Sequence, residues 1–362
     1  MTITTATDAA GTGEWPRGSP TATQQRTTPA LTTVEAAYGR RAVAAVAGEI
    51  GALAMSCDAP LTARPAWSLA TSEASTLLRP WAVLARDEAG TLVGAVVMQD
   101  QIQDPRAVLT TLAGTDGGHR GAILTNDATV ALALGDAVRS ALDAQPSPAT
   151  VILGPLPDGS AVVHAFASGL SGSTEDAAAP IPVIRRDAGA APDDFLASGM
   201  RRSLRKAANR LEADDRTVRT RFTTDASEIV ALVPHLERVH RQRDHMHGRI
   251  SDLDDAVRHR AWRHRIRNLI DVGLLELAVL EIDDDLAAYT LGVVDGADYR
   301  LLEGRFVTRW ARYSPGRLLE LAVVERVLAD PAFTTFDWMT AVAPESLLGR
   351  NDTDPMVLVQ LG

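Results

Sequence analysis

The stretch Tyr313-Ser314-Pro315-Gly316-Arg317-Leu318-Leu319 marks the place where a loop ends and a helix begins. Proline is tolerated in the first turn of a helix, and glycine lets a ligand approach the backbone closely. The unpaired N–H groups and partial positive charge of a helix start hold phosphate well. We therefore expect a phosphate site that includes Arg312, Ser314, Gly316 and Arg317. The alternative is that Pro-Gly merely begins a buried helix.

Apolar patterns around this stretch predict helices that alternate with strands. The expected helices are residues 195–213, 227–243, 252–272 and 315–328, and the expected strands are 274–281, 286–294, 299–306 and 333–339. This order predicts a mixed sheet flanked by helices.

The preceding residues show a similar order of elements. We expect helices at 34–54, from 65, at 128–142 and at 159–167, strands at 81–85, 92–97, 107–113, 121–124 and 150–153, and a loop at 169–179. Both parts contain a hairpin with an acidic turn, which suggests an internal duplication. The predicted fold class is therefore mixed α/β, with two tandem halves at residues 32–190 and 191–362. Residues 1–31, rich in Thr, Ala, Gly and Pro, are expected to form a disordered tail.

Composition limits the class of protein. The chain has 362 residues, 46% hydrophobic and 23% charged, which fits a soluble protein of two domains. No run approaches the ~20 apolar residues of a membrane helix. Cys57 is the only cysteine, so we expect a cytoplasmic protein without a disulfide or membrane contact. The net charge is −10, yet arginines are concentrated in the second half, where an anionic partner should bind.

Four segments resemble motifs of the GNAT superfamily of acyltransferases, in its CelD-like and Fem-like subfamily. Residues 313–319 are similar to its Y-x-P-G-x-L-L segment, and Phe336-Asp337-Trp338-Met339 to its F-D strand. Residues 201–212 are similar to its basic helix, and residues 60–67 to the entry of its first half. The phosphate loop Arg/Gln-x-x-Gly-x-Gly/Ala of many GNAT proteins does not occur at this spacing. A Tyr-Lys pair and a Trp that usually follow the F-D strand are replaced by residues 343–350.

This resemblance implies which residues perform acyl transfer to an amine. The amine must lose a proton, and the strand before the phosphate-binding helix lines the site. Glu303 lies among apolar residues of that strand, where burial would raise its pKa, so it is the first candidate for general base. The alternative is an ion pair with Arg305 or Arg300. Asp337 is expected to orient substrate or to cap a turn, and Tyr313 to protonate the leaving thiolate or simply to pack.

Histidines and arginines of the second half supply further candidates. Six of the eight histidines lie within residues 235–264, and of these His240 or His245 is expected to contact the acceptor. A metal site is not expected, because arginines lie between the histidines and repel a cation. Arg205 belongs to the basic helix, for which three interpretations stay open: a solvated face, contact with a phosphate of coenzyme A or a carrier protein, and contact with tRNA.

The resemblance thus implies an N-acyltransferase that moves an acyl group from acyl-CoA, its co-substrate, to an amine of a small molecule or peptide by direct attack. One alternative is a Fem-like transferase that uses aminoacyl-tRNA. The other is a non-catalytic ligand-binding protein on a GNAT fold. The first half lacks the Pro-Gly motif and is expected to be degenerate and to shape the acceptor site.

Overall fold

The computed structural model describes residues 31–74, 78–101, 108–111, 120–144, 150–186, 195–196, 198–246, 248–339 and 347–362. The tail expected at residues 1–31 lies outside these residues, except for Leu31, which begins the first strand.

The first half contains strands and helices in alternation. In chain order they are β1 (Leu31–Tyr38), α1 (Gly39–Ala45), α2 (Ala47–Ser56), η1 (Leu61–Ala63), α3 (Pro65–Ser68), α4 (Ala70–Ala74), β2 (Leu78–Asp87), β3 (Leu92–Gln101), β4 (Val108–Thr111), α5 (Ala128–Asp143), β5 (Thr150–Pro157), α6 (Ala161–Gly169) and β6 (Thr174–Arg185).

The second half begins with a long helix and then follows a similar order. Its elements are α8 (Ser198–Ala213), β7 (Val218–Thr223), α9 (Ala226–Met246), η3 (Asp252–Asp254), α10 (Ala256–Asp271), β8 (Leu275–Ile282), β9 (Asp285–Asp295), β10 (Asp298–Phe306), η4 (Thr308–Tyr313), α11 (Pro315–Ala329), β11 (Thr335–Asp337) and β12 (Asp352–Leu361).

The strands form one sheet in the order β1-β2-β3-β4-β5-β12-β6-β11-β10-β9-β8-β7. Each half begins with one strand and a set of helices. Three antiparallel strands follow, then a helix, and finally a strand that is parallel to the third of those three strands. This shared order confirms the expected tandem, mixed α/β architecture.

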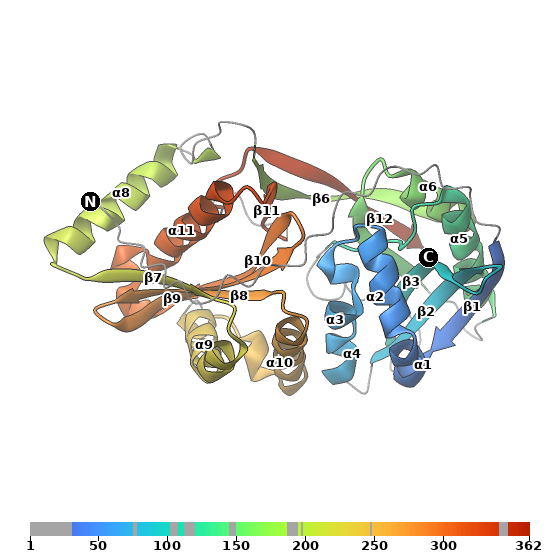
Figure 1. Ribbon diagram of the computed structural model, residues 1–362, viewed down its shortest axis with the longest axis horizontal. Coiled ribbons are helices and arrows are strands. Elements are labelled where there is room, and N and C mark those ends of the chain that lie inside the picture. The colour runs from blue at the N-terminus through green and yellow to red at the C-terminus, as the bar shows by residue number, and fades with distance from the viewer. Residues whose placement is uncertain are drawn as a thin grey trace.

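Strand β12 crosses the expected boundary between the halves. It pairs antiparallel with both β5 and β6, so residues 352–361 complete the sheet of the first half. The end of β6, at Val183–Arg185, pairs in turn with β11 of the second half. A boundary at residues 190 and 191 therefore does not divide the sheet, which Figure 1 shows running through the whole molecule.

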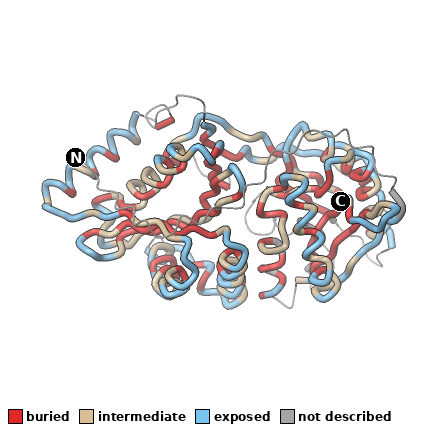
Figure 2. The backbone as a smooth tube through the Cα atoms, viewed as in Figure 1, coloured by how far each residue is buried: buried red, intermediate tan, exposed pale blue. Residues whose placement is uncertain are grey.

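Helices cover both faces of the second half. Helices α8 and α11 lie over one face, with Leu204, Leu211, Leu319 and Val323 in a shared core. Helices α9 and α10 cover the other face, where Leu236, Trp262 and Leu269 pack on β8 and β9. Figure 2 shows that the strands between the layers are mostly buried, whereas α8 exposes much of its length. The candidate site lies in this second half.

Three predictions for the first half were wrong. Residues 34–38, expected to be helical, belong to β1 because they pair with Trp81–Ala85 at the sheet edge. Residues 174–179, expected to be a loop, form part of β6 because β12 supplies a partner for this small, polar segment. Within residues 121–124 the structure shows a single bridge from Leu124 to Ala95 in place of the expected strand. In each case tertiary pairing overrides the local pattern.

Candidate active site

Strands β10 and β11 separate soon after they begin to pair. Asp298, Tyr299 and Arg300 pair with Thr335–Asp337, where β11 ends. Strand β10 continues to Phe306 and pairs there only with β9 on its other side. In the part of the chain that the structure describes, no strand therefore pairs with this edge of β10 from Leu301 onward.

A β-bulge directs Glu303 toward α9 and α10. Leu301 pairs with Gly292, and Glu303 pairs with the adjacent Leu291, so Leu302 is an extra residue in β10. Leu302 packs in the core beneath α9 and α10, and the side chain of Glu303 also contacts these helices. Bulges re-aim side chains in this way and occur often beside active sites.

The Glu303 carboxylate accepts hydrogen bonds from three elements. Its Oε1 accepts from the Tyr289 hydroxyl and from His240 Nδ1 at 2.9 Å, and its Oε2 accepts from Trp262 Nε1 at 2.9 Å. Burial alone would raise the pKa of Glu303, but the His240 hydrogen bond, the positive charges of His240 and Arg305 and the Tyr289 hydrogen bond lower it to about 2. The expectation of a raised pKa was therefore wrong, because it considered burial without these donors.

His240 lies beneath the end of β10, held by this carboxylate. An ionised carboxylate only accepts hydrogen bonds, so Nδ1 carries the proton that it donates to Glu303. Nε2 is then the atom left for chemistry, and it lies 3.3 Å from Arg305 Nη2 and 3.2 Å from Asp244 Oδ2. The ring is buried and meets Trp262 edge-on at 6.3 Å. Glu303 and His240 together form a carboxylate–imidazole pair of the kind that moves protons.

The other candidate histidine is separate from this pair. The His245 side chain is 54% exposed, and its Nε2 lies 2.6 Å from Asp254 Oδ2. Among the described residues no group of three or more histidine, cysteine or acidic side chains is arranged to hold a metal ion.

The start of α11 packs against the end of β10. Ser314 adopts a left-handed conformation with φ +50°, and Pro315 occupies the first turn of the helix. A Cβ atom at Gly316 would lie 3.3 Å from Phe306 Cδ1, so glycine permits this close packing. Arg312 and Arg317 flank the helix start, but Arg312 pairs with Asp214 at 2.7 Å and Arg317 with Glu320 at 2.9 Å.

Tyr313 lies on the opposite face of the sheet from Glu303. Its side chain is 2% exposed in the core beneath α8 and α11, and its hydroxyl donates to Asp214 Oδ2 at 2.6 Å. The structure therefore does not bring Tyr313 together with Glu303 and His240.

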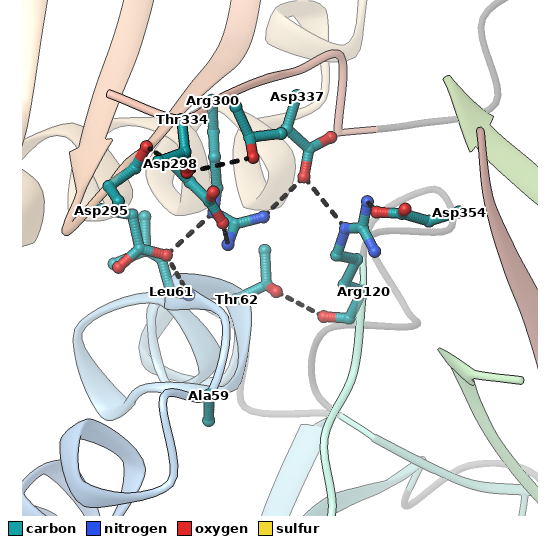
Figure 3. Close-up of polar contacts among 12 residues, drawn as sticks. Ala59, Leu61, Thr62, Arg120, Asp295, Asp298, Arg300, Thr334, Asp337 and Asp354 are labelled. Atoms are coloured by element: carbon teal, nitrogen blue, oxygen red, sulfur yellow. Dashed lines mark hydrogen bonds and ion pairs between the residues drawn. The ribbon is translucent and has the colours of Figure 1, made fainter. Parts of the chain in front are cut away.

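Asp337 belongs to a buried ion network between the two halves (Figure 3). Its Oδ2 accepts from Arg300 Nη1 at 2.6 Å and from Arg120 Nε at 2.9 Å, while Oδ1 accepts from the Met339 N–H at 2.6 Å. The last contact is the turn cap named above as the alternative role. Arg120 also pairs with Asp354, so this network joins β10 and β11 to the first half.

The same network extends to η1 of the first half. Arg300 Nε donates to Asp295 Oδ2 at 2.8 Å, and the same carboxylate accepts from the Leu61 N–H at 3.0 Å. Arg64 pairs with its other oxygen. These contacts attach η1 to the end of β9.

The exposed face of α8 carries Arg205 and its basic neighbours. Leu204, Ala207 and Leu211 face the core, which leaves Arg205 on the exposed side. Arg210 from the same helix donates to the Arg312 carbonyl at 2.8 Å. The basic helix is thus joined to the residues that precede α11.

Sequence reasoning missed Trp262, Tyr289 and Glu320. The first two were included in apolar patterns, which do not reveal which polar atom points at Glu303. Burial raises the pKa of Glu320, and the positive charge of Arg317 opposes this effect. Its only sequence signal is the three-residue spacing from Arg317, which is common on helix surfaces.

The sequence profile of the acetyltransferase (GNAT) domain matches residues 198–345, which include β7 to β11. The second half is a GNAT domain. This domain match supports an N-acyltransferase enzyme of the GNAT type. In the described helices, none is long and apolar enough to cross a membrane.

Solved structures share the fold of both halves. The structure of FemX is 12% identical and covers 87% of this chain and 95% of its own, with a TM-score of 0.59. The C-terminal domain of a putative lysylphosphatidylglycerol synthetase from Agrobacterium fabrum is 12% identical and covers 88% and 92%, with a TM-score of 0.52. A protein of unknown function from Bacteroides thetaiotaomicron is 11% identical and covers 88% and 97%, with a TM-score of 0.55. No curated protein matches the sequence significantly.

Proposed function

We propose that the second half transfers an acyl group from acyl-CoA to an amine of a small-molecule or peptide acceptor. The observation that carries this proposal is the combination of a separated β10 edge with the start of α11. A helix leaves the N–H groups of its first turn without an acceptor within the helix, and Gly316 lies in the first turn of α11. They suit the pyrophosphate of coenzyme A, and the edge of β10 beyond Leu301 suits its extended pantetheine arm.

The His240–Glu303 pair supports direct attack by the amine. The amine nitrogen forms a bond to the thioester carbonyl carbon and gives its proton to His240 Nε2. The carbon–sulfur bond then breaks, and the thiolate leaves as coenzyme A once it gains a proton. Glu303 acts as a positioning residue here: it fixes the imidazole and stabilises its positive charge, since a carboxyl with a pKa of about 2 is a weak base.

The donor site is tested by calorimetric titration with acetyl-CoA and CoA. We expect wild-type protein to bind both with a Kd of about micromolar order. Ser314→Asp places a carboxylate at the start of α11 and should weaken both by at least about 10-fold. Ser314→Asn tolerates the same left-handed conformation without the charge and should bind normally. No binding to wild-type protein, or equal binding to both variants, contradicts this donor site.

The exposed basic face of α8 favours a second candidate, transfer from aminoacyl-tRNA. Arg202, Arg205 and Lys206 lie on that face, and no ion pair joins these three to a described carboxylate. Two structures with the same fold are those of FemX and a putative lysylphosphatidylglycerol synthetase domain. Titration with charged tRNA at several salt concentrations tests this candidate. A steep salt dependence that Arg202→Gln with Arg205→Gln reduces would support it.

A further inference from the structure

Two arginines lie together at the end of β10, on the side of His240. Arg305 comes from β10, and its Nη2 is 3.3 Å from His240 Nε2. Arg243 comes from the last turn of α9, and its guanidinium lies over the Phe306 ring, 4.4 Å from the ring centre. Both side chains are partly buried.

Neither guanidinium forms an ion pair with a carboxylate among the described residues, although, against the effect of burial, the charge of Glu303 raises the pKa of Arg305. Arg243 Nη1 and Arg305 Nε are buried and have no hydrogen-bond partner among the described residues. Arg305 Nη1 donates to the carbonyl of Gly304 at 2.9 Å. Burial lowers the pKa of Arg243, and the charges of Arg305 and Arg249 lower it further. Such an arrangement costs free energy, because buried charges need partners.

The carboxylates near Arg243 and Arg305 bond to other groups and do not pair with these two arginines. Glu303 already accepts from Tyr289, His240 and Trp262, as described above. Asp244 accepts from the Ser251 hydroxyl at 2.9 Å and lies 3.2 Å from His240 Nε2.

Three other arginines with an unpartnered nitrogen differ from these two. Arg64, Arg221 and Arg326 each have a buried Nε without a partner, yet each pairs with a carboxylate through another nitrogen. Arg243 and Arg305 form no ion pair with any carboxylate among the described residues. Their guanidinium groups therefore lie near each other at the end of β10 without a paired carboxylate among the described residues.

We infer that Arg243 and Arg305 form a subsite for an oxyanion, a carboxylate or phosphate group carried by the acceptor. Guanidinium groups bind both anions through paired N–H donors. The subsite adjoins His240 Nε2, so an acceptor anchored there by its anionic group would present its amine to the proton acceptor. This assignment to the acceptor rests on the proposed function, whereas the oxyanion subsite itself does not.

The subsite is tested by calorimetric titration with inorganic phosphate and with acetate, each against a chloride background. We expect Arg243→Gln and Arg305→Gln each to weaken binding of at least one probe by about 10-fold. Arg243→Lys keeps the charge but loses the paired donors, so it should bind with intermediate affinity. This variant replaces Arg243→Gln in the test if the glutamine variant does not fold. Arg238→Gln, an exposed position on the same helix, should bind like wild type. Equal binding by wild-type protein and all folded variants overturns the inference.

Saturating acetyl-CoA distinguishes the acceptor from the donor as the source of the oxyanion. If phosphate binds equally well with and without acetyl-CoA, the subsite belongs to the acceptor. If acetyl-CoA excludes phosphate and Arg243→Gln weakens acetyl-CoA itself, the subsite holds a donor phosphate, and the assignment to the acceptor is wrong. Arginine-dependent phosphate binding by a protein that does not bind acetyl-CoA would contradict the proposed donor and leave the oxyanion subsite in place.

Discussion

At the residue scale, the central feature of the site is a carboxylate that orients a histidine. Glu303 and His240 are 63 positions apart in sequence and meet because a bulge directs Glu303 toward α9. Three hydrogen-bond donors contact the carboxylate, which explains why it remains ionised although it is buried. In the proposed mechanism Glu303 positions a base, whereas the sequence predicted that Glu303 was the base.

Replacement of this carboxylate should separate catalysis from binding. We expect Glu303→Gln to lower kcat by about 100-fold, because the imidazole loses its oriented anion, while KM changes little. His245→Asn is the matched control, since His245 lies outside the pair and should keep wild-type kcat. Steady-state kinetics with acetyl-CoA and an accepted amine provide the measurement. A Glu303→Gln enzyme with unchanged kcat would exclude the positioning role.

The same carboxylate should make folding stability depend on acid. The pKa of Glu303 is about 2 in the folded protein and 4.5 ordinarily, so the unfolded chain binds its proton first. Its stabilising contribution is therefore complete above pH 4.5 and is lost as pH falls toward 2. Urea unfolding across this range should show a shallower loss of stability for Glu303→Gln than for wild-type protein. If the free energy of unfolding fell equally with pH in the two proteins, the low pKa of Glu303 would be contradicted.

At the element scale, close contacts between neighbouring elements hold the layers together. Helices α5 and α6 approach each other so closely that a Cβ at Gly135 would lie 2.2 Å from the Phe166 carbonyl. A Cβ at Gly169 would lie 2.1 Å from the Leu132 carbonyl in return. Such a crossing needs glycine on both helices, because backbone cannot move aside as a side-chain tip can.

An alanine at this crossing should therefore force the two helices apart. We expect Gly135→Ala to lower the free energy of unfolding by about 1–3 kcal/mol. Gly51→Ala, in α2, meets no atom within 4 Å and should raise it by about 0.5–1 kcal/mol through better helix propensity. Thermal and urea unfolding of both variants measure the difference. If Gly135→Ala raised the free energy of unfolding as Gly51→Ala does, the crossing would not be tight.

The element order of the second half was largely predictable because its strands and helices carry strong periodic patterns. Helix 315–328 and strand 299–306, for example, differ from α11 and β10 by one residue at one end. Two strands were missed although signals existed: β7 reads Val-Arg-Thr-Arg-Phe-Thr, and β12 contains Met356-Val357-Leu358-Val359. Glu303 and His240 were named separately, but their contact depends on tertiary packing, which periodicity does not encode.

At the scale of the whole molecule, the two halves are united by the network of charges around Asp337. This carboxylate is 1% exposed and contacts Arg300 of the second half and Arg120 of the first. Arginines and aspartates alternate through this network, so each buried charge has an opposite neighbour. Removal of one member leaves its partners charged in a poorly solvated place.

We expect Asp337→Asn to lower the free energy of unfolding by about 3–5 kcal/mol, because Arg300 and Arg120 lose a shared anion. Asp352→Asn removes an exposed partner of Arg185 in the neighbouring strand and should have little effect. Urea unfolding of the two variants provides the comparison. Similar stability of the Asp337→Asn and Asp352→Asn proteins would show that the network contributes nothing particular to the union of the halves.

The position of β12 has a consequence for how the protein is made. A ribosome completes the helices and the first six strands of the first half long before it reaches residues 352–361, yet those residues fill the place between β5 and β6. Until they emerge, both strand edges are open to pairing with other nascent chains. Folding on the ribosome therefore cannot proceed one unit after another, as it does in most proteins of two domains. The half that is translated first is the half that finishes last.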